Sequence, residues 1–444
     1  MKKSDVLDIK KDSDFVIQTS RREFFKKTAI YSAGALSVSS VLSPVSLKAD
    51  DPAIINEAPW GQKLGDPVDK NLYGVPSPYE HNNIRRTHDL FSSGDPYASV
   101  SMCPIHESEG IITPNGLFFT RNHGGTAHVD PNEWRLMIHG KVKKEIVLTL
   151  DDLKKYPSET RIYFIECPAN GSPEWRGPQF NSLQFMKGLM SAAQWTGVML
   201  KTILDDLGLE KDAVWMLAEG SDNASNPRTI PVEKALDDVM VVWAQNGEAL
   251  RPEQGYPVRL IVPGWEGNLN TKWLRRLEFS DKPWHSKEET SKYTMLQKSG
   301  KAIRYFWVNE VNSVITSPCP EKPWTNLKKG ELVEIEGLAW SGHGTIKGVD
   351  ISFDGGDNWV EAKLKGLVLP KSWTRFSYMI RWEGKPLILA SRSYDDFGNI
   401  QPTIDQETSA VGVESVYHRN AIVTWEITEK GECNNVQIRK HKKA

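Results

Sequence analysis

Cysteine is the residue with the widest chemistry in this chain, and it is scarce. The 444 residues contain four cysteines, Cys103, Cys167, Cys319 and Cys433, too few for a disulfide framework to organise the fold. Cys167 lies in the run I-E-C-P-A-N, which predicts a turn after a buried strand. Its thiolate could bind a soft, redox-active metal, and the alternative is a small apolar residue of the core. The sequence leaves open whether any of the other cysteines pair in a disulfide.

A cation, an amide and an imidazole follow an aromatic strand in a second cluster, the run F-F-T-R-N-H that ends at His123. Arg121 in this run could hold an anionic oxygen through a forked, charge-assisted contact. The alternative is an ordinary surface arginine beside a histidine at the end of a strand. The types of residue therefore indicate an anion site without requiring one.

A third cluster spans residues 255–273 and places Arg259 on a strand before a Pro-Gly turn. The Gly- and Asn-rich loop that follows leads to Lys272. Backbone N–H groups and an ammonium can together bind a phosphate, whereas the alternative is a solvated loop. Lys292 and Tyr293 follow on a polar connector, where an exposed tyrosine by itself would indicate no chemistry.

Two domains must position these clusters. Residues 115–279 alternate short β-like runs with brief helical ones, which predicts an α+β domain with mixed sheets. Helices are expected at Thr149–Lys155 and at Gly197–Leu207, where apolar residues recur with a period of 3.6. The expected strands are Leu117–Arg121, Trp134–Ile138, Ile162–Ile165, Ala213–Leu217, Val239–Trp243 and Val258–Ile261.

The sequence pattern changes beyond Arg304, where runs of alternating apolar and polar residues are separated by turn-forming residues. This pattern predicts an all-β, immunoglobulin-like sandwich, a module that usually serves assembly rather than chemistry. The predicted strands include Val333–Leu338, Gly348–Phe353, Ser377–Trp382 and Ile388–Tyr394. The predicted segments are 1–49 (signal peptide), 50–84 (extended arm), 85–300 (catalytic domain), 301–432 (sandwich) and 433–444 (basic tail).

The amino terminus carries an export signal. The run S-R-R-E-F-F-K-K starts at Ser20 and precedes a mildly apolar stretch and a plausible cleavage site near Ala49. This is the pattern of a twin-arginine signal, and the alternative is an accidental arginine pair. The twin-arginine route exports folded proteins, so we expect a periplasmic protein that is loaded with a cofactor and has no membrane span in its mature form. The formal net charge of -2 indicates no broad basic face for nucleic acid.

Seven motifs in a fixed order carry a family resemblance: F-F-T-R-N-H, I-E-C-x-x-N, W-T-G-V, E-G-x-D, G-Y-P-V-R-L-x-V-P-G, N-x-K-W-L-R-R-L and S-K-Y-T. In these motifs the chain resembles the sulfite oxidase family of molybdenum-pterin enzymes from about residue 85 to its end. Several runs, among them E-E-T-S-K-Y-T, are most similar to the SoxC type, the molybdenum subunits of sulfane (or sulfite) dehydrogenases in bacterial sulfur-oxidising (Sox) systems. The resemblance implies a mixed α/β molybdopterin-binding domain followed by an immunoglobulin-like dimerisation domain.

The resemblance also implies roles for individual residues. Cys167 would be the thiolate ligand of molybdenum, Arg121 would face the substrate oxygens, and Tyr293 would donate a hydrogen bond to the reacting group. Arg419 could contribute from the second domain. The residues implied to bind the molybdopterin are Phe119, Thr120, Arg121, Asn122, His123, Lys187, Asp222, Gln254, Arg259, Asn270, Thr271 and Lys272.

Two departures from the family pattern bear on the substrate. Gly171 stands where sulfite oxidases have an arginine, and Gln254 stands where they have a histidine. A free sulfite dianion benefits from several guanidinium groups, whereas a sulfane sulfur on a carrier's cysteine needs room and fewer charges. The sequence therefore favours a carrier-bound sulfane sulfur, with free sulfite as the alternative.

The implied reaction is oxygen-atom transfer to sulfur, after which the electrons leave one at a time. The chain contains no Cys-x-x-Cys-His motif for a c-type haem, so we expect a separate c-type cytochrome subunit as acceptor, a sulfur-carrier protein as substrate, and a homodimer within a heteromer. Two other classes remain open: a molybdenum reductase of the methionine-sulfoxide type, whose members lack the second β domain, and a non-enzymatic periplasmic binding protein.

Overall fold

The computed structural model describes residues 62–64, 67–88, 97–98 and 100–439 of the chain. The predicted signal peptide and residues 50–61 and 65–66 of the predicted arm lie outside the described residues. The chain divides into two compact units, Met1–Ser77 and Pro78–Ala444. The described part of the first unit contains one 3-10 helix, η1 (Val68–Asn71), and its Leu64 and Leu72 side chains are exposed. All other elements belong to the second unit.

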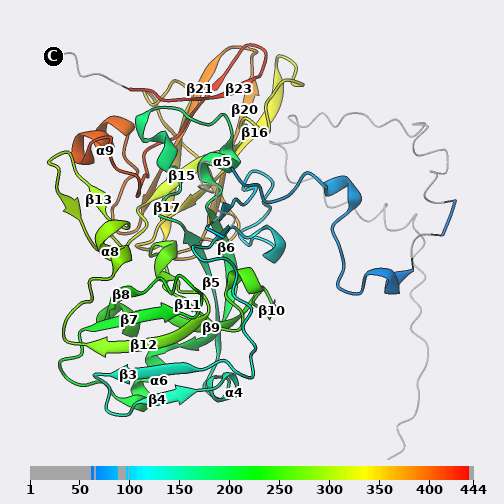
Figure 1. Ribbon diagram of the computed structural model, residues 1–444. Helices are drawn as coiled ribbons and strands as arrows, with labels where there is room; N and C mark the ends of the chain where they lie inside the picture. Colours follow the sequence, from blue (N-terminus) through cyan, green and yellow to red (C-terminus); the bar gives the residue numbers. More distant parts are fainter. Residues whose placement is uncertain (1–61, 65–66, 89–96, 99, 440–444) are drawn as a thin grey trace, which may run out of the picture. The chain divides into compact units, whose positions relative to one another are not determined.

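The first domain of the second unit is built on two five-stranded sheets (Figure 1). One has the order β10-β9-β6-β5, with β11 also paired to β9, and the other has the order β4-β3-β12-β7-β8. Only β12 and β3 pair in parallel among the strands of these sheets that the structure describes. The strands are β3 (Leu136–Gly140), β4 (Ile146–Leu148), β5 (Glu159–Glu166), β6 (Met190–Met199), β7 (Trp215–Gly220), β8 (Arg228–Pro231), β9 (Met240–Gln245), β10 (Glu248–Ala249), β11 (Arg259–Ile261) and β12 (Leu274–Ser280).

The helices are short, and all of those after η1 belong to the first domain except α9, which lies between β21 and β22 of the second domain. Outside the two sheets lie a small strand pair, β1 with β2, and a hairpin of β13 and β14. Their bounds are β1 (Val100–Ser101), β2 (Thr120–Arg121), β13 (Met295–Leu296) and β14 (Ala302–Ile303). The helices are η2 (Pro78–Glu80), η3 (Asn115–Leu117), α4 (Leu150–Leu153), η4 (Ser172–Arg176), α5 (Leu183–Lys187), α6 (Leu200–Leu207), α7 (Val232–Asp237), η5 (Pro252–Gln254), η6 (Gly267–Leu269), α8 (Lys287–Ser291) and α9 (Ile404–Val411).

The helix predicted at Gly197–Leu207 exists, but it begins three residues later than the periodicity indicated. Leu200, Ile203, Leu204 and Leu207 form its buried face as predicted. Residues 197–199 instead continue β6, because Gly197 pairs so closely with β9 that a Cβ there would lie 2.2 Å from a backbone oxygen. The apolar run is buried in both conformations, so the period alone could not locate the boundary.

Two other local predictions have mixed outcomes. The helix expected at Thr149–Lys155 is the shorter α4, which begins after a capping box formed by Thr149 and Asp152. The strand expected at Leu117–Arg121 is wrong over its first residues. A 3-10 turn occupies Asn115–Leu117, and only Thr120 and Arg121 pair as a strand.

The second domain is an all-β sandwich, as predicted, with sheets ordered β15-β16-β20-β19 and β18-β17-β21-β22-β23. Trp340, Trp373 and Trp425 fill its core with 0% of their surface exposed. The last strand includes four residues that were predicted to begin the basic tail, because they pair with β22. The strands are β15 (Asn312–Ser317), β16 (Glu331–Trp340), β17 (Ile346–Ser352), β18 (Val360–Glu361), β19 (Lys363–Lys365), β20 (Thr374–Trp382), β21 (Leu387–Asp395), β22 (Thr424–Ile427) and β23 (Cys433–Val436).

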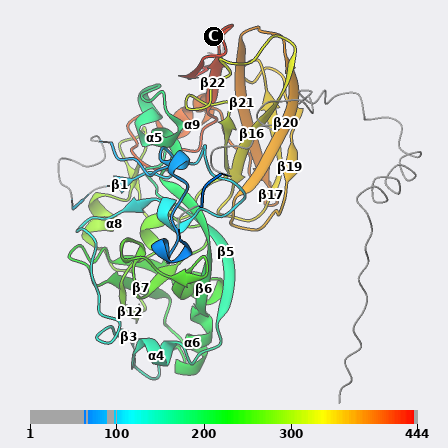
Figure 2. The ribbon, with the colours of Figure 1, turned by 90° about the vertical axis from the view of Figure 1, so that its right-hand side faces the viewer.

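The sandwich and the first domain share one continuous core. Buried side chains of β5 and β6 belong to the same apolar cluster as those of β15 and β16. The backbones also meet directly: Phe164 N–H donates to the Lys371 carbonyl at 3.1 Å, and Asn309 N–H donates to the Gly264 carbonyl at 2.9 Å. In Figure 2, β5 runs upward along the first domain toward the sandwich. The end of β5 is therefore held by both domains.

Among the described residues, none of the helices combines the length and the apolar character that crossing a membrane requires. All four cysteines lie in the described part of the chain, and none of them forms a disulfide. Cys103, Cys319 and Cys433, for which the sequence left a disulfide open, are free thiols in this structure.

Candidate active site

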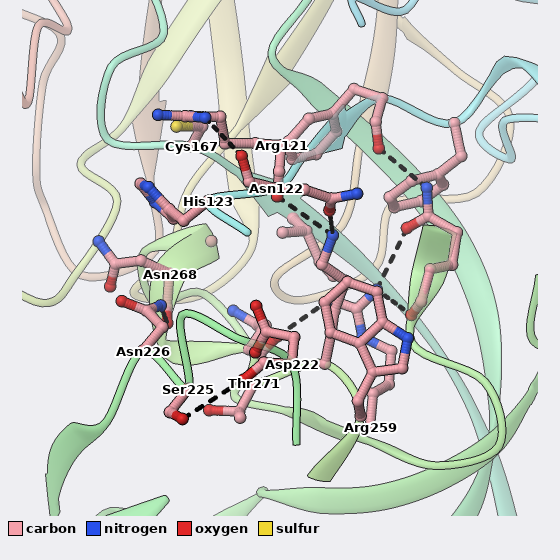
Figure 3. A pocket seen from close by; sticks show the side chains of 18 of the residues that line it. Arg121, Asn122, His123, Cys167, Asp222, Ser225, Asn226, Arg259, Asn268 and Thr271 are labelled. Atoms are coloured by element: carbon pink, nitrogen blue, oxygen red, sulfur yellow. Dashed lines mark hydrogen bonds between the residues drawn. The ribbon is translucent and has the colours of Figure 1, made fainter. Parts of the chain in front are cut away.

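A cavity brings the three sequence clusters together in the first domain (Figure 3). In Figure 3, Cys167 and Arg121 lie at one end, and Asp222, Ser225 and Thr271 lie at the other. The predicted site residues that line the cavity are Phe119, Arg121, Asn122, His123, Cys167, Asp222, Gln254, Arg259, Asn270, Thr271, Lys272 and Tyr293. Residues separated by up to 174 positions thus form one surface.

Cys167 begins a turn directly after β5. Its N–H donates to the Leu189 carbonyl at 2.9 Å, and its carbonyl accepts from Asn170 N–H at 2.9 Å. Gly267 lies so close that a Cβ there would stand 3.3 Å from the Cys167 Cα. Burial raises the pKa of the Cys167 thiol to about 11. The thiol therefore keeps its proton in the protein alone, and a bound metal cation would supply the positive charge that a thiolate needs here.

Arg121 lies beside Cys167 in Figure 3. Its Nη1 donates to the carbonyl oxygens of Ala98 and Asn122, both at 2.6 Å. These two contacts hold the guanidinium in place without neutralising it, because a carbonyl carries no net charge. Arg121 therefore supplies a fixed positive charge at the cysteine end of the cavity.

Tyr293 is buried, with 6% of its surface exposed, although its position on a polar connector predicted exposure. The α8 helix, which has a capping box formed by Ser286 and Glu289, leads the chain into this position. The Tyr293 hydroxyl lies 2.7 Å from His123 Nε2. Burial, with Arg121 nearby, lowers the pKa of His123 to about 3, and burial raises the pKa of Tyr293. The imidazole is therefore neutral and the phenol protonated, so one hydrogen bond joins them, and its direction depends on the tautomer of His123.

The opposite part of the cavity has two buried cations. Arg259 donates to the Gln254 carbonyl at 3.0 Å and to the Asn270 carbonyl at 3.1 Å. Lys272 donates to the carbonyl oxygens of Arg121 and Glu253, and to the Asn122 side chain. Burial lowers the pKa of Arg259 to about 9 and that of Lys272 to about 7. Neither cation forms an ion pair with a carboxylate of the described residues, so both suit an anionic ligand.

Several polar atoms on the cavity wall are buried without a hydrogen-bond partner. They are Arg259 Nε, Thr271 Oγ1, Asn226 Oδ1 and Asn268 Oδ1. Buried polar groups normally have partners, so donors and acceptors that lack them beside two buried cations fit a polar, anionic ligand such as a phosphorylated pterin. Together with a cysteine at the far end, the donor set fits a molybdenum-pterin cofactor.

The sequence did not identify every residue of the cavity wall. Asn226 and Ser225 adopt φ values of 38° and 54° in a tight loop, and Asn268 lies in the Gly- and Asn-rich loop without having been singled out. The Asn-Pro pair at 226–227 was the available signal for the first of these. The lining residues that were not predicted are Phe118, Ile165, Ser225, Asn226, Gly267, Asn268 and Trp273.

Two predicted cofactor residues do not line the cavity. The Thr120 hydroxyl accepts a hydrogen bond from Arg85 at 2.6 Å. Lys187 is fully buried behind the Cys167 turn, where its Nζ donates to the Arg419 carbonyl at 3.3 Å. The sequence contains the motif M-K-G-L, but its lysine, at the end of α5, does not line the cavity. Lys187 Nζ instead lies near Gly171 and donates a hydrogen bond to the second domain.

Gly171 also lies outside the cavity lining. Its φ is +80°, and a Cβ at this position would lie 3.2 Å from Lys187 Nζ. A side chain at residue 171 would therefore start toward Lys187. The sequence argument that Gly171 removes a charge from the substrate pocket does not follow directly from this geometry. Gln254, the other departure, does line the cavity, and its side chain bridges the Phe119 carbonyl and Arg259.

The second domain contributes directly to the surroundings of the cysteine, although a module of this kind usually serves assembly. The Tyr417 ring lies 5.5 Å from that of Tyr293, and His418 N–H donates to the Pro168 carbonyl at 2.9 Å. Arg419 is buried and lies 3.8 Å from Glu407. It lines a smaller pocket on the other side of Cys167 and does not line the main cavity.

Comparisons with known proteins agree with this geometry. A family model described as "Oxidoreductase molybdopterin binding domain" matches residues 123–288, and one described as "Mo-co oxidoreductase dimerisation domain" matches residues 304–425. These matches lie within the segments predicted as 85–300 and 301–432.

Known relatives cover most of the chain. Chicken (Gallus gallus) sulfite oxidase is 30% identical over 375 residues, with 78% of each chain covered. Rat (Rattus norvegicus) mitochondrial sulfite oxidase is 30% identical over 355 residues, which span 73% of this chain and 63% of the rat protein. The crystal structure of the sulfane dehydrogenase SoxCD from Paracoccus pantotrophus superimposes with a TM-score of 0.85 and 43% identity, covering 88% of this chain and 100% of that chain.

Proposed function

The chain belongs to the sulfite oxidase family of molybdopterin oxidoreductases, with molybdenum-molybdopterin as its cofactor, and from this premise we propose that it is a periplasmic sulfane dehydrogenase. It oxidises a sulfane sulfur that a carrier protein holds on a cysteine, and it passes the electrons to a c-type cytochrome. The observation that carries this proposal is the meeting of Cys167, Arg121 and Tyr293 around a cavity with unpaired cations. The 43% identity to a sulfane dehydrogenase supports the choice of substrate.

The residues present define how the cofactor would be held. Cys167 would ligate the molybdenum, while Arg259 and Lys272 would bind the phosphate. Asn226, Asn268 and Thr271 would pair with the pterin through the atoms that lack partners. When bound, the cofactor supplies a two-electron oxidation with transfer of an oxygen atom to sulfur.

Arg121 and the pair of His123 and Tyr293 supply the protein's own part of the reaction. Arg121 stabilises negative charge on the oxygens of the oxidised sulfur, because its guanidinium is held by two carbonyl oxygens and by no carboxylate of the described residues. Tyr293 donates a hydrogen bond at the same end of the cavity. Because the phenol has a single proton, its oxygen would accept a hydrogen bond from His123 Nε2–H, 2.7 Å away, while the proton points to the reacting group.

Charge at the cysteine end supports a carrier-bound substrate over free sulfite. Arg121 and Arg259 are the arginines among the described lining residues, and Arg259 is held by Gln254 and Asn270. A free dianion would be served better by more guanidinium groups around one position. Free sulfite remains the second candidate, because the chicken relative is a sulfite oxidase of 30% identity.

The decisive experiment compares two substrates with purified holoenzyme. Cytochrome c reduction is measured with free sulfite and with a carrier protein that bears a cysteine persulfide. We expect efficient turnover with the carrier and weak turnover with sulfite. Efficient turnover with sulfite alone, at a low KM, would contradict the proposed substrate, and a soluble protein purified without molybdenum would contradict the enzymatic proposal.

The location and partners are part of the same proposal. The twin arginines Arg21 and Arg22 support export in the folded state, and replacing both by lysine should retain the protein in the cytoplasm. The match to a dimerisation domain supports a homodimer. The absence of a Cys-x-x-Cys-His motif from the sequence supports a separate cytochrome subunit. Copurification from the native periplasm tests both partnerships.

A further inference from the structure

The turn that carries Cys167 is fastened to the second domain by a short series of buried hydrogen bonds. Trp340, the last residue of β16, donates its indole N–H to Glu166 Oε2 at 2.7 Å. The other carboxylate oxygen of Glu166 accepts from Asn170 Nδ2 at 2.8 Å. Trp340, Asn170 and Glu166 expose 0%, 2% and 6% of their surface. Water therefore cannot replace these contacts.

The same series closes around Cys167 itself. Asn170 Oδ1 accepts from Leu189 N–H at 3.1 Å, and the Leu189 carbonyl accepts from Cys167 N–H at 2.9 Å. Asn170 N–H donates to the Cys167 carbonyl. Both backbone groups of Cys167 are thus engaged by residues that Glu166 holds in place. Moving the cysteine would break several buried hydrogen bonds at once.

From this geometry we infer that Trp340 of the sandwich is a positioning residue for the sulfur of Cys167. This inference rests on the proposed function, in which that sulfur ligates molybdenum. Trp340 acts through Glu166 and does not line the cavity. The second domain therefore determines where a ligand of the metal stands, in addition to any role in assembly.

Trp425 shows how an ordinary core tryptophan of the same sandwich behaves. It is equally buried, and its indole N–H donates to the Ile315 carbonyl at 3.0 Å. That contact lies within the sandwich and holds strands together. Trp340 instead donates to a carboxylate of the other domain, on the residue that immediately precedes Cys167. Such groups behind a metal ligand tune its orientation.

The experiment compares Trp340→Phe with Trp425→Phe in the purified holoenzyme. Each variant loses one buried indole N–H, but only the first loses a contact to Glu166. Molybdenum content, the paramagnetic resonance spectrum of the half-reduced metal, kcat and KM are measured for both. We expect Trp340→Phe to shift the spectrum and to lower kcat about tenfold with little change in KM, the lower end of the range for groups behind metal ligands. Trp425→Phe should leave the spectrum and kcat as in the wild type.

Glu166→Gln provides a second variant of nearly identical shape. A glutamine can accept one of the two hydrogen bonds but presents a donor to the other, so the spectrum should shift although packing is preserved. An unchanged spectrum and kcat in both Trp340→Phe and Glu166→Gln would overturn the inference. A wild-type protein without molybdenum would instead overturn the proposed function, so the two failures are distinguishable.

Discussion

The two sides of Cys167 treat buried charge in opposite ways. On the cavity side, Arg259 and Lys272 are buried without a carboxylate partner among the described residues, and neighbouring polar atoms lack hydrogen bonds. On the sandwich side, Glu166 accepts two side-chain hydrogen bonds. Glu174 accepts two from backbone N–H groups and one from Asn435.

This difference separates the side that would bind the cofactor from the side that fixes the position of Cys167. Leaving a buried polar group unpaired costs about 1–3 kcal/mol, so a fold does not keep several of them in one place without a compensating partner. Satisfied carboxylates, in contrast, make a rigid support. Cys167 lies on the boundary between the two sides, where a metal ligand needs both access and support.

The largest expected effect comes from replacing the residue on the boundary. Cys167→Ser keeps the shape of the turn but removes the soft thiolate ligand. We expect turnover with the cytochrome acceptor to fall by more than about 100-fold, because even residues behind a metal ligand cost 10–100-fold. Turnover and molybdenum content of the purified variant measure this effect. A variant with wild-type turnover would show that Cys167 is no ligand.

Removing the fixed charge on the cavity side should have the next largest effect. Arg121→Met should lower kcat/KM by about 100-fold, which is the lower range for losing a group that stabilises developing charge. Arg135 offers a matched control, because its Nη1 also donates to two carbonyl oxygens but lies on the exposed surface. Steady-state kinetics should show Arg135→Met within a factor of two of the wild type, and equal losses in both variants would contradict the comparison.

Glu174, a carboxylate on the sandwich side without a hydrogen bond to the Cys167 turn residues Glu166 or Asn170, should affect stability instead of activity. Glu174→Ala leaves the N–H groups of Gln179 and Phe180 without their acceptor. We expect the free energy of unfolding to fall by about 2 kcal/mol, with the molybdenum content unchanged. Denaturant titration provides the measurement. Glu432 is exposed, so Glu432→Ala should change stability by no more than about 0.5 kcal/mol; an equal effect of both substitutions would argue against a special support behind Cys167.

In the cofactor-free protein, the buried lysine of the cavity side should produce a pH dependence of stability. Burial lowers the pKa of Lys272 to about 7, below its ordinary value in the unfolded chain. Between pH 7 and about 10.5 the unfolded state therefore binds more protons than the folded state, and stability rises with pH. This rise amounts to at most about 1.4 kcal/mol per pH unit. Unfolding midpoints at pH 7 and 9 should show the rise in the wild type and a smaller one in Lys272→Met.

An anionic ligand should reverse this behaviour, because it favours the charged form of Lys272. Holoenzyme should therefore show a flatter dependence of stability on pH than the cofactor-free protein. Identical slopes for the wild type and Lys272→Met, with and without cofactor, would mean that Lys272 does not carry the unpaired charge that distinguishes the cavity side.

Much of the architecture could be predicted from local patterns. In the sandwich strands, apolar and polar residues alternate along the sequence, which predicted the strands. The buried face of α6 follows its period of 3.6. The start of α6 could not be predicted, because residues 197–199 are apolar and are buried by β9 in a strand. The edge strand at Cys433–Val436 was missed for a similar reason, since its pairing with β22 is a contact between segments.

The candidate site divides in the same way. The motifs identified Arg121, Cys167, Arg259 and Lys272 as candidates, and the resemblance to a family implied the role of each. Tyr293 looked exposed on its connector, yet it is buried against His123 from 170 positions away. Lys187 matched a motif, yet the direction of α5 carries its side chain behind the cysteine.

Residue types and their spacing indicated a possible thiolate ligand, an anion site and a phosphate-binding loop, and the family resemblance assigned their roles. Which buried groups are paired and which lack partners depends on atoms brought together from distant segments. Trp340 and Glu166 are 174 positions apart and meet only when the sandwich docks on the end of β5. Because the bond is buried, no water can replace it, and its loss would leave a buried polar group unpaired at a cost in free energy.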